Sequence, residues 1–166
     1  MGLRMTLSCD WFVLAGQVLC DRLTNQLTIL NVLDGVSAIS FPAQHPGFAF
    51  AARYRWEGEL PAAPQPVAYR LVRESEGRAP QTVCELSGDW SNTSRMGRVY
   101  QNFKMLRLFQ PEVIQFRLEH RIGEGPWVEG ARASVDVTRL VLSDDERAQL
   151  VAQMAELGLP TDGLDG

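Results

Sequence analysis

The sequence predicts a mainly β protein, an antiparallel β-sandwich of about eight or nine strands with one C-terminal α-helix. Three observations lead to this fold class. Short apolar runs recur between turns that contain Gly or Pro, with no helical pattern between them. Apolar and polar residues alternate in residues 114–119 and 131–138, as in strands with one buried face. From Ser143 onward the apolar residues follow a helical period instead.

The N-terminal part of the chain contains the most apolar runs. Residues 7–19 predict one long strand or two short ones, and Gly16 marks the position of a bend or bulge. Residues 18–35 predict a hairpin with a polar turn. The second strand of this hairpin has apolar side chains on both faces, which is typical of a strand in the middle of a sheet. We therefore expect the hairpin to form the centre of the core.

Strands and turns alternate in the middle of the chain. Residues 36–41 predict a strand that ends at Pro42, and residues 43–47 predict a loop because they contain the turn sequence His-Pro-Gly. Residues 48–56 predict a strand with one buried and one hydrated face. The prolines of residues 57–66 predict an extended connection. Further strands are expected at residues 67–71, 82–86, 99–109, 114–119 and 131–138.

The C-terminal segment predicts one amphipathic helix. Ser143 and Glu146 have the spacing of a capping box, and Gly158 with Pro160 ends the helical run. The apolar side chains at helical spacing are Leu150, Val151, Met154 and Leu157. We expect a sandwich domain over residues 1–142, a helix over residues 143–158 that packs on the sandwich or on a partner, and a frayed tail over residues 159–166.

The first hairpin also carries a family resemblance. Cys20-Asp21, a short polar turn, Leu27-Thr28-Ile29-Leu30, Asp34 and Ser40-Phe41-Pro42 together resemble the start of the uncharacterised bacterial family called domain of unknown function 6941. The resemblance covers residues 18–137. The sequence departs from the family pattern at Asn31, where glycine is usual, and at Leu33, where an aromatic residue is usual. The resemblance implies an immunoglobulin-like β-sandwich, and it implies no chemistry because the family has none assigned.

Length and charge exclude several classes of protein. A chain of 166 residues is suited to one domain. The net charge is −4, of which residues 143–166 contribute −5, so the preceding residues carry +1. A nearly neutral body argues against general nucleic-acid binding. No apolar window reaches the roughly 18 residues of a membrane span, and Asp10 interrupts the N-terminal apolar run, so we expect no membrane insertion, no signal peptide and a cytoplasmic protein.

The cysteines and histidines do not indicate an enzyme. Cys9, Cys20 and Cys84 lie in apolar runs without the spacing of a zinc site, so we expect reduced thiols in a reducing compartment, with no metal and no cofactor. His45 and His120 are the available general bases, and no nucleophile motif accompanies either. A histidine-based hydrolase is therefore not favoured.

A pair of carboxylates is the remaining catalytic possibility. Asp21 and Asp34 flank the second strand of the first hairpin and would support catalysis if they converged. Aspartates at strand ends more often form turns by bonding nearby backbone amides. We favour the turn role for both residues.

The most unusual local feature is a basic stretch, residues 91–111, which contains no acidic residue. It can be a docking surface for an acidic or phosphate-bearing partner, because arginine forks suit such groups. It can also be an edge strand whose charges prevent association of sheets, an interpretation that we weigh slightly higher. The candidate binding residues are Arg95, Arg98, Tyr100, Lys104 and Arg107.

The leading functional prediction is a non-enzymatic protein-interaction module that uses this stretch to bind an acidic protein or a second copy of itself. The alternative, from a different class, is a sandwich that binds a small molecule or carbohydrate and can also be catalytic. In that case Trp90 and Trp127 would contact the ligand, because both stand beside turns and aromatic faces stack on sugar rings.

Overall fold

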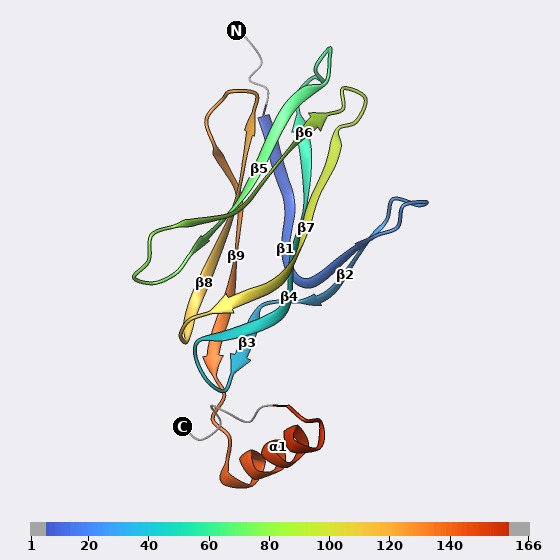
Figure 1. Cartoon of the computed structure of the whole chain (residues 1–166). Coiled ribbons are helices and arrows are strands. Elements are labelled where there is room, and N and C mark those ends of the chain that lie inside the picture. Colours follow the sequence, from blue (N-terminus) through green and yellow to red (C-terminus); the bar gives the residue numbers. More distant parts are fainter. Residues whose placement is uncertain (1–5, 160–166) are drawn as a thin grey trace.

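The protein is described here by a computed structural model of residues 6–159, which confirms the mainly β class (Figure 1). Nine strands of the described residues form two sheets, followed by helix α1 (Asp144–Glu156). Sheet 1 has the order β2-β1-β4-β7, and sheet 2 has the order β3-β9-β8-β5-β6. The strands are β1 (Thr6–Cys20), β2 (Leu27–Val32), β3 (Gly35–Ala38), β4 (Ala43–Glu57), β5 (Gln65–Glu74), β6 (Gln81–Trp90), β7 (Met96–Leu108), β8 (Glu112–Ile122) and β9 (Val128–Arg139).

The main core lies between the two sheets. Alternate side chains of β4, from Phe48 to Trp56, point inward and are at most 1% exposed, as the alternation predicts. From β8, Ile114, Phe116 and Leu118 are fully buried on the opposite side. The rings of Phe48 and Phe116 lie 5.0 Å apart between centroids and join the two layers. Each such buried side chain stabilises the fold by about 1.5–3 kcal/mol.

The expectation that the first hairpin forms the centre of the core is wrong. Strand β1 pairs with β4 as far as Ala15 and then with β2, so β2 is an edge strand and the hairpin projects from the sandwich (Figure 1). One face of β2 packs Leu27 and Ile29 against a second, smaller apolar cluster on the outer face of sheet 1. The other face leaves Val32 63% exposed. Apolar residues on both faces therefore did not require burial on both faces.

The prediction of a loop at residues 43–47 is also wrong, because these residues begin β4. Ala43–Pro46 pair with β7, while β1 has already left β4 at Ala15. Pro46 is tolerated because no strand pairs on its other side. Gly47 has a φ of 74°, a conformation that glycine adopts without strain. All strand pairs are antiparallel except β3 with β9, which is a short parallel pair.

The predicted capping box of helix α1 is confirmed. The Ser143 hydroxyl accepts from the Glu146 amide at 3.3 Å, and the Glu146 carboxylate accepts from the Ser143 amide at 2.9 Å. No residue of the helix is buried, and the helix lies beyond one end of the sandwich (Figure 1). Packing of the helix on a partner remains a prediction. Most of the expected frayed tail lies outside the described residues.

Within residues 6–159, no helix has both the length and the apolar character needed to cross a lipid bilayer.

Candidate functional site

The basic stretch lies mainly on β7, which is the edge strand of sheet 1 opposite β2. Arg98, Tyr100 and Lys104 alternate along the strand and point away from the core, while Val99 faces inward and is buried. Arg107 is exposed near the end of the strand. The structure thus places four of the five predicted binding residues on one strand, and Arg95 directly precedes it. An edge position is also what the protective interpretation of these charges requires.

The cations of this stretch lack acidic partners. Arg95, Arg98, Lys104 and Arg107 form no ion pair with any residue that the structure describes. Arg95 and Arg98 donate instead to backbone carbonyls, those of Gly58 and Asn25. Their charge is therefore available to an acidic group from outside the chain.

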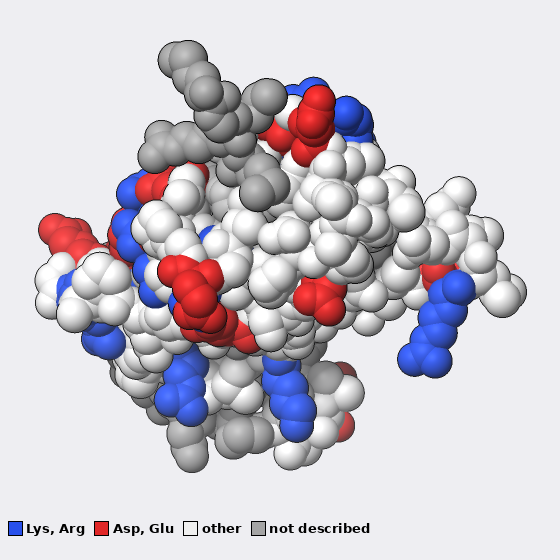
Figure 2. All heavy atoms as spheres, turned by 90° about the horizontal axis from the view of Figure 1, so that it is seen from above, with Lys and Arg blue, Asp and Glu red and all other residues white. Residues whose placement is uncertain are grey.

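The outer face of sheet 2 shows the opposite arrangement. Its arginines and glutamates neutralise one another in a ladder of ion pairs that runs over β5, β8 and β9. On the left of Figure 2, acidic and basic side chains lie next to one another. Members of the ladder are Arg70, Glu74, Arg117, Glu119, Glu129 and Arg132. The arginines of this face therefore have acidic partners, which the cations of β7 lack.

Exposed apolar side chains are interleaved with the β7 cations. Met96, Tyr100 and Met105 are 42%, 38% and 41% exposed. We call this mixed basic and apolar surface the β7 strip. It consists of Arg95, Met96, Arg98, Tyr100, Lys104, Met105 and Arg107. A surface of this composition can contact a partner that has both acidic and apolar groups.

A hollow of about 870 Å³ adjoins the β7 strip. It forms because the hairpin bends over the outer face of sheet 1 and is held there by Asn102, whose side chain exchanges two 2.8 Å hydrogen bonds with the backbone of Val18. The half-buried indole of Trp11 lines the hollow together with Arg98 and Tyr100. Sequence reasoning missed Trp11 because it stands inside an apolar run that otherwise supplies the core.

The side chains that line this hollow also carry a net positive charge. Arg53 lines it and pairs with Asp10 at 3.2 Å, whereas Arg98 has no acidic partner among the described residues. Among residues 6–159, no Asp or Glu side chain lines the hollow. A hydrogen bond with Cys20 raises the pKa of the Tyr100 hydroxyl, so this phenol stays neutral. These groups can hold an acidic or aromatic side chain of a partner.

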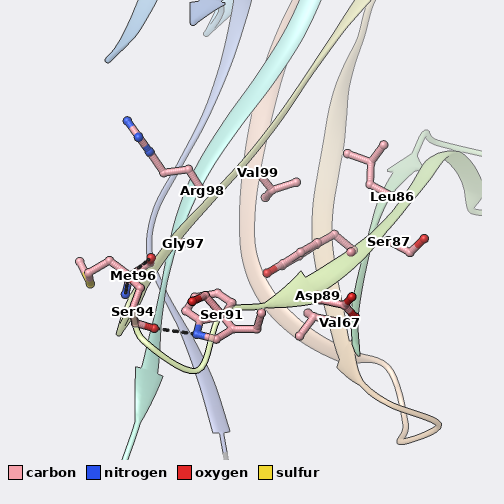
Figure 3. A pocket seen from close by; sticks show the side chains of 13 residues that line it. Val67, Leu86, Ser87, Asp89, Ser91, Ser94, Met96, Gly97, Arg98 and Val99 are labelled. Carbon is pink, nitrogen blue, oxygen red and sulfur yellow. Dashed lines mark hydrogen bonds between the residues drawn. The ribbon is translucent and has the colours of Figure 1, made fainter. Parts of the chain in front are cut away.

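A second cleft, of about 370 Å³, opens between β6 and β7, where the edges of the two sheets meet (Figure 3). Its apolar wall includes Val67 and Val99, and its rim carries Asp89 and Arg98. Among the described residues, two serines of the cleft bond to their own loop: the Ser91 hydroxyl lies 2.7 Å from that of Thr93, and the Ser94 hydroxyl donates to the Met96 carbonyl at 2.8 Å. Neither hydroxyl bonds to a described base that would activate it for covalent catalysis.

Trp90, a predicted ligand-binding residue, packs into the base of this cleft. Only 6% of it is exposed, its ring lies 5.8 Å from that of Trp56, and its Nε1 donates to the Ser94 carbonyl at 2.9 Å. Gly97 faces the ring so closely that a Cβ there would lie 2.5 Å from the indole. Trp90 offers no open ring face to a sugar.

Trp127, the other predicted ligand-binding residue, is covered by two arginines. The guanidinium carbons of Arg70 and Arg121 lie 4.4 Å and 4.7 Å from its ring centroid. These arginines pair with Glu119 and Glu85. The indole is thus part of the charged surface of sheet 2, whereas β7 belongs to sheet 1.

The remaining candidate groups do not form a catalytic centre. His45 lies on β4 and contacts the Gly47 carbonyl at 3.1 Å, whereas His120 is buried on β8. Asp21 forms a turn by accepting from the amides of Leu23 and Thr24, which lowers the pKa of its carboxyl. No cluster of three potential metal ligands occurs among residues 6–159.

The three cysteines are free thiols on different parts of the sandwich. Cys9 and Cys84 pack against the main core on β1 and β6, and Cys20 lines the hollow at the end of β1. Burial raises the pKa of the Cys9 thiol to about 11, which makes it a poor nucleophile at neutral pH.

His120 gives a prediction about pH. It is 4% exposed, its Nδ1 has no hydrogen-bond partner, and burial lowers its pKa below the usual 6.5. The unfolded chain therefore takes up a proton at higher pH than the folded chain does, and stability falls as the pH decreases through about 6.5. Urea unfolding between pH 8 and pH 5 should show this decline.

A His120→Phe variant should show a shallower decline, since it keeps an aromatic ring beside Tyr54 and removes the titrating group. His45→Asn is the second histidine replacement, and comparison of the two slopes isolates the contribution of His120. An unchanged slope in His120→Phe would show that other groups cause the pH dependence.

The fold and the site together define a two-sheet β-sandwich in which one edge strand carries a run of cations that form no ion pair with a described residue. No family model matches the sequence, and no curated protein matches it. Among solved structures, the chain is similar to superoxide reductase (neelaredoxin) from Ignicoccus hospitalis, with a TM-score of 0.36 and 14% identity, over 76% of this chain and 82% of that chain. A likeness this weak carries no information about the fold or function of this chain.

Proposed function

We propose that the protein is a non-enzymatic interaction module that binds an acidic, partly apolar protein segment along the β7 strip. The observation that carries this proposal is the contrast between the two sheets. The arginines on the outer face of sheet 2 are neutralised by glutamates, whereas the four cations of the β7 strip form no ion pair with a described residue. Cations that face acidic groups of a partner give specificity and speed the encounter, because complementary charges steer association.

The hollow beside the strip supports the same function. It places the Trp11 indole and the Tyr100 phenol next to the Arg98 guanidinium. Aromatic residues and arginine are the side chains most enriched at the energetic centres of protein interfaces. An apolar side chain of the partner would fill the hollow while its acidic neighbours pair with the strip.

We further propose two properties that accompany this function. The free thiols of Cys9, Cys20 and Cys84 support residence in a reducing compartment such as the cytoplasm. The resemblance to domain of unknown function 6941 supports an immunoglobulin-like arrangement of the sandwich.

The test is a quantitative pull-down with an Arg98→Glu, Lys104→Glu variant. Both side chains are exposed, so the fold and melting temperature should be retained. Partner recovery should drop about tenfold or more, because two attractive contacts become repulsive. Recovery by the parent protein should also fall as salt is raised, since charges are screened over about 10 Å at 0.1 M salt.

The matched control reverses two cations away from the strip, Arg78→Glu and Arg139→Glu. Each of these stacks on a phenylalanine ring and forms no ion pair with a described residue. This control should recover the same partners as the parent. If the Arg98→Glu, Lys104→Glu variant also recovers every partner, the strip only protects an edge strand and the proposal is wrong.

A further inference from the structure

The cleft and the hollow described above lie on opposite sides of one strand edge. They share part of their lining, which consists of Ser94, Met96, Gly97 and Arg98. The next residue, Val99, points into the cleft, whereas the Arg98 side chain points to the other side of β7 (Figure 3). The first half of β7 therefore separates an apolar cleft from a cationic hollow.

The backbone along this edge has hydrogen-bonding groups that sheet 1 does not use. The Trp56 amide donates to the Arg95 carbonyl at 2.8 Å, and β4 and β7 keep the same register from there to Phe103. Because hydrogen-bonded and non-hydrogen-bonded pairs alternate in an antiparallel ladder, the N–H and C=O groups of Arg98 and Tyr100 point away from β4. These groups form no hydrogen bond with a residue that the structure describes.

Side chains close both ends of this open edge. The Ser94 hydroxyl donates to the Met96 carbonyl at 2.8 Å and accepts from the Met96 amide at 3.2 Å. The Gln101 side chain donates to the Asn102 carbonyl at 2.9 Å. The open part between them is short and is therefore suited to a single short segment in extended conformation.

The cations of this edge leave the cleft open. Edge strands are often protected by charged side chains that point into the sandwich. On β7 the inward positions beside the cleft are Gly97 and Val99, whereas Arg98 and Lys104 point outward. A strand added here would have apolar groups on its inner side and cations on its outer side.

From this geometry, we infer that the partner supplies an extended segment that adds to sheet 1 as a new strand, antiparallel to β7. Its outward side chains are acidic, with one aromatic ring in the hollow, and its inward side chains are apolar and enter the cleft. Main-chain hydrogen bonds to Arg98 and Tyr100 provide affinity, and the two rows of side chains provide specificity. This inference rests on the proposed function, because it names the conformation and pattern of the acidic partner. A second copy of β7 fits less well, since it would bring like charges together.

The probe is a synthetic peptide with blocked ends, Glu-Val-Glu-Val-Phe-Val-Glu-Val-Glu, which is as long as the segment from Met96 to Lys104. Amide hydrogen exchange of the full chain is followed by NMR with and without the peptide. Exchange at Arg98 and Tyr100 should slow about tenfold or more when the peptide is bound. Val99 is the internal control, because its amide already faces β4.

Methylated peptides separate strand addition from attraction between charges. In the antiparallel arrangement, the amides of the outward residues, glutamate and phenylalanine, face β7, whereas the amides of the valines face solvent. N-methylation of the outward amides should therefore raise the dissociation constant about tenfold or more. N-methylation of the valine amides should leave it unchanged, although both peptides carry the same charge.

The outcomes separate this inference from the proposed function. If the Arg98→Glu, Lys104→Glu variant loses its protein partner but the peptide leaves exchange at Arg98 and Tyr100 unchanged, the proposed function stands and strand addition is wrong. If that variant recovers every partner, both are wrong. Equal affinity of the unmethylated peptide and the peptide methylated at its outward amides would also overturn strand addition.

Light scattering tests the other occupant of the edge. The parent chain alone should have its 18.5 kDa monomer mass, with rapid exchange at Arg98 and Tyr100. A dimer in which both amides are already protected would show that a second copy occupies the edge, and it would overturn the inference.

Discussion

Replacement of Trp90 by alanine is expected to lower the free energy of unfolding by about 3–5 kcal/mol, the range for truncating a large buried aromatic side chain. The ring fills the open end between β6 and β7 and packs at a tilt against Trp56, and its Nε1 donates to the Ser94 carbonyl. Its removal leaves a cavity at this end, because Gly97 has no side chain to fill the space. Urea unfolding followed by circular dichroism measures the loss.

Trp127→Ala is the matched control for this prediction. Trp127 is half-exposed and contacts two arginines on the outer face of sheet 2, so its loss should cost about 1 kcal/mol or less. Equal costs for the two variants would contradict the core role assigned to Trp90. Equal costs would instead support a role for Trp90 in ligand binding.

A loss of about 3–5 kcal/mol is also expected for Glu112→Ala, which breaks a buried ion pair by removing one partner. The side chains of Glu112 and Arg73 are 1% and 9% exposed, and their charged groups approach to 3.6 Å. The Glu112 carboxylate also accepts from the Glu76 amide at 3.2 Å. The variant would leave a buried guanidinium without its counter-ion and an amide without its acceptor.

The double variant Arg73→Met, Glu112→Leu should cost less than Glu112→Ala alone, because no charge is then left unpaired. Urea unfolding of this double variant and of its two single variants, Arg73→Met and Glu112→Leu, gives the coupling between the residues. Part of the cost of the double variant will come from the 2.7 Å hydrogen bond that Arg73 donates to the Arg107 carbonyl. If Glu112→Ala costs less than about 1 kcal/mol, water must already solvate the pair.

Much of the fold could be predicted because the relevant forces act between near neighbours in the chain. The alternation of apolar and polar residues in β8 and in the second half of β4 correctly predicted which face of each strand is buried. Side chains of a strand point alternately to its two sides. The capping box at Ser143 needed only two residues three positions apart. The position of β2 at a sheet edge could not be predicted, because the strands that pair with it are determined by contacts across the whole sheet.

The candidate site was predicted only in part. The basic stretch was visible because it contains no acidic residue over a long run of the sequence. The hollow was not visible, since Trp11, Arg98 and the hairpin meet only after β1 leaves β4 and bends over sheet 1. The tryptophans were misjudged because a turn in sequence does not show whether the adjacent ring points into the core or into solvent.

By itself, the sequence determined that this chain forms a β-sandwich with a capped helix and a run of uncompensated positive charge. Tertiary structure decided which cations remain unpaired. The arginines on the outer face of sheet 2 form ion pairs with glutamates on neighbouring strands, as Arg117 does with Glu74. Arg98 and Lys104 form none with a described residue. The reason is that cross-strand register, which brings opposite charges within contact distance, is set by long-range pairing and burial.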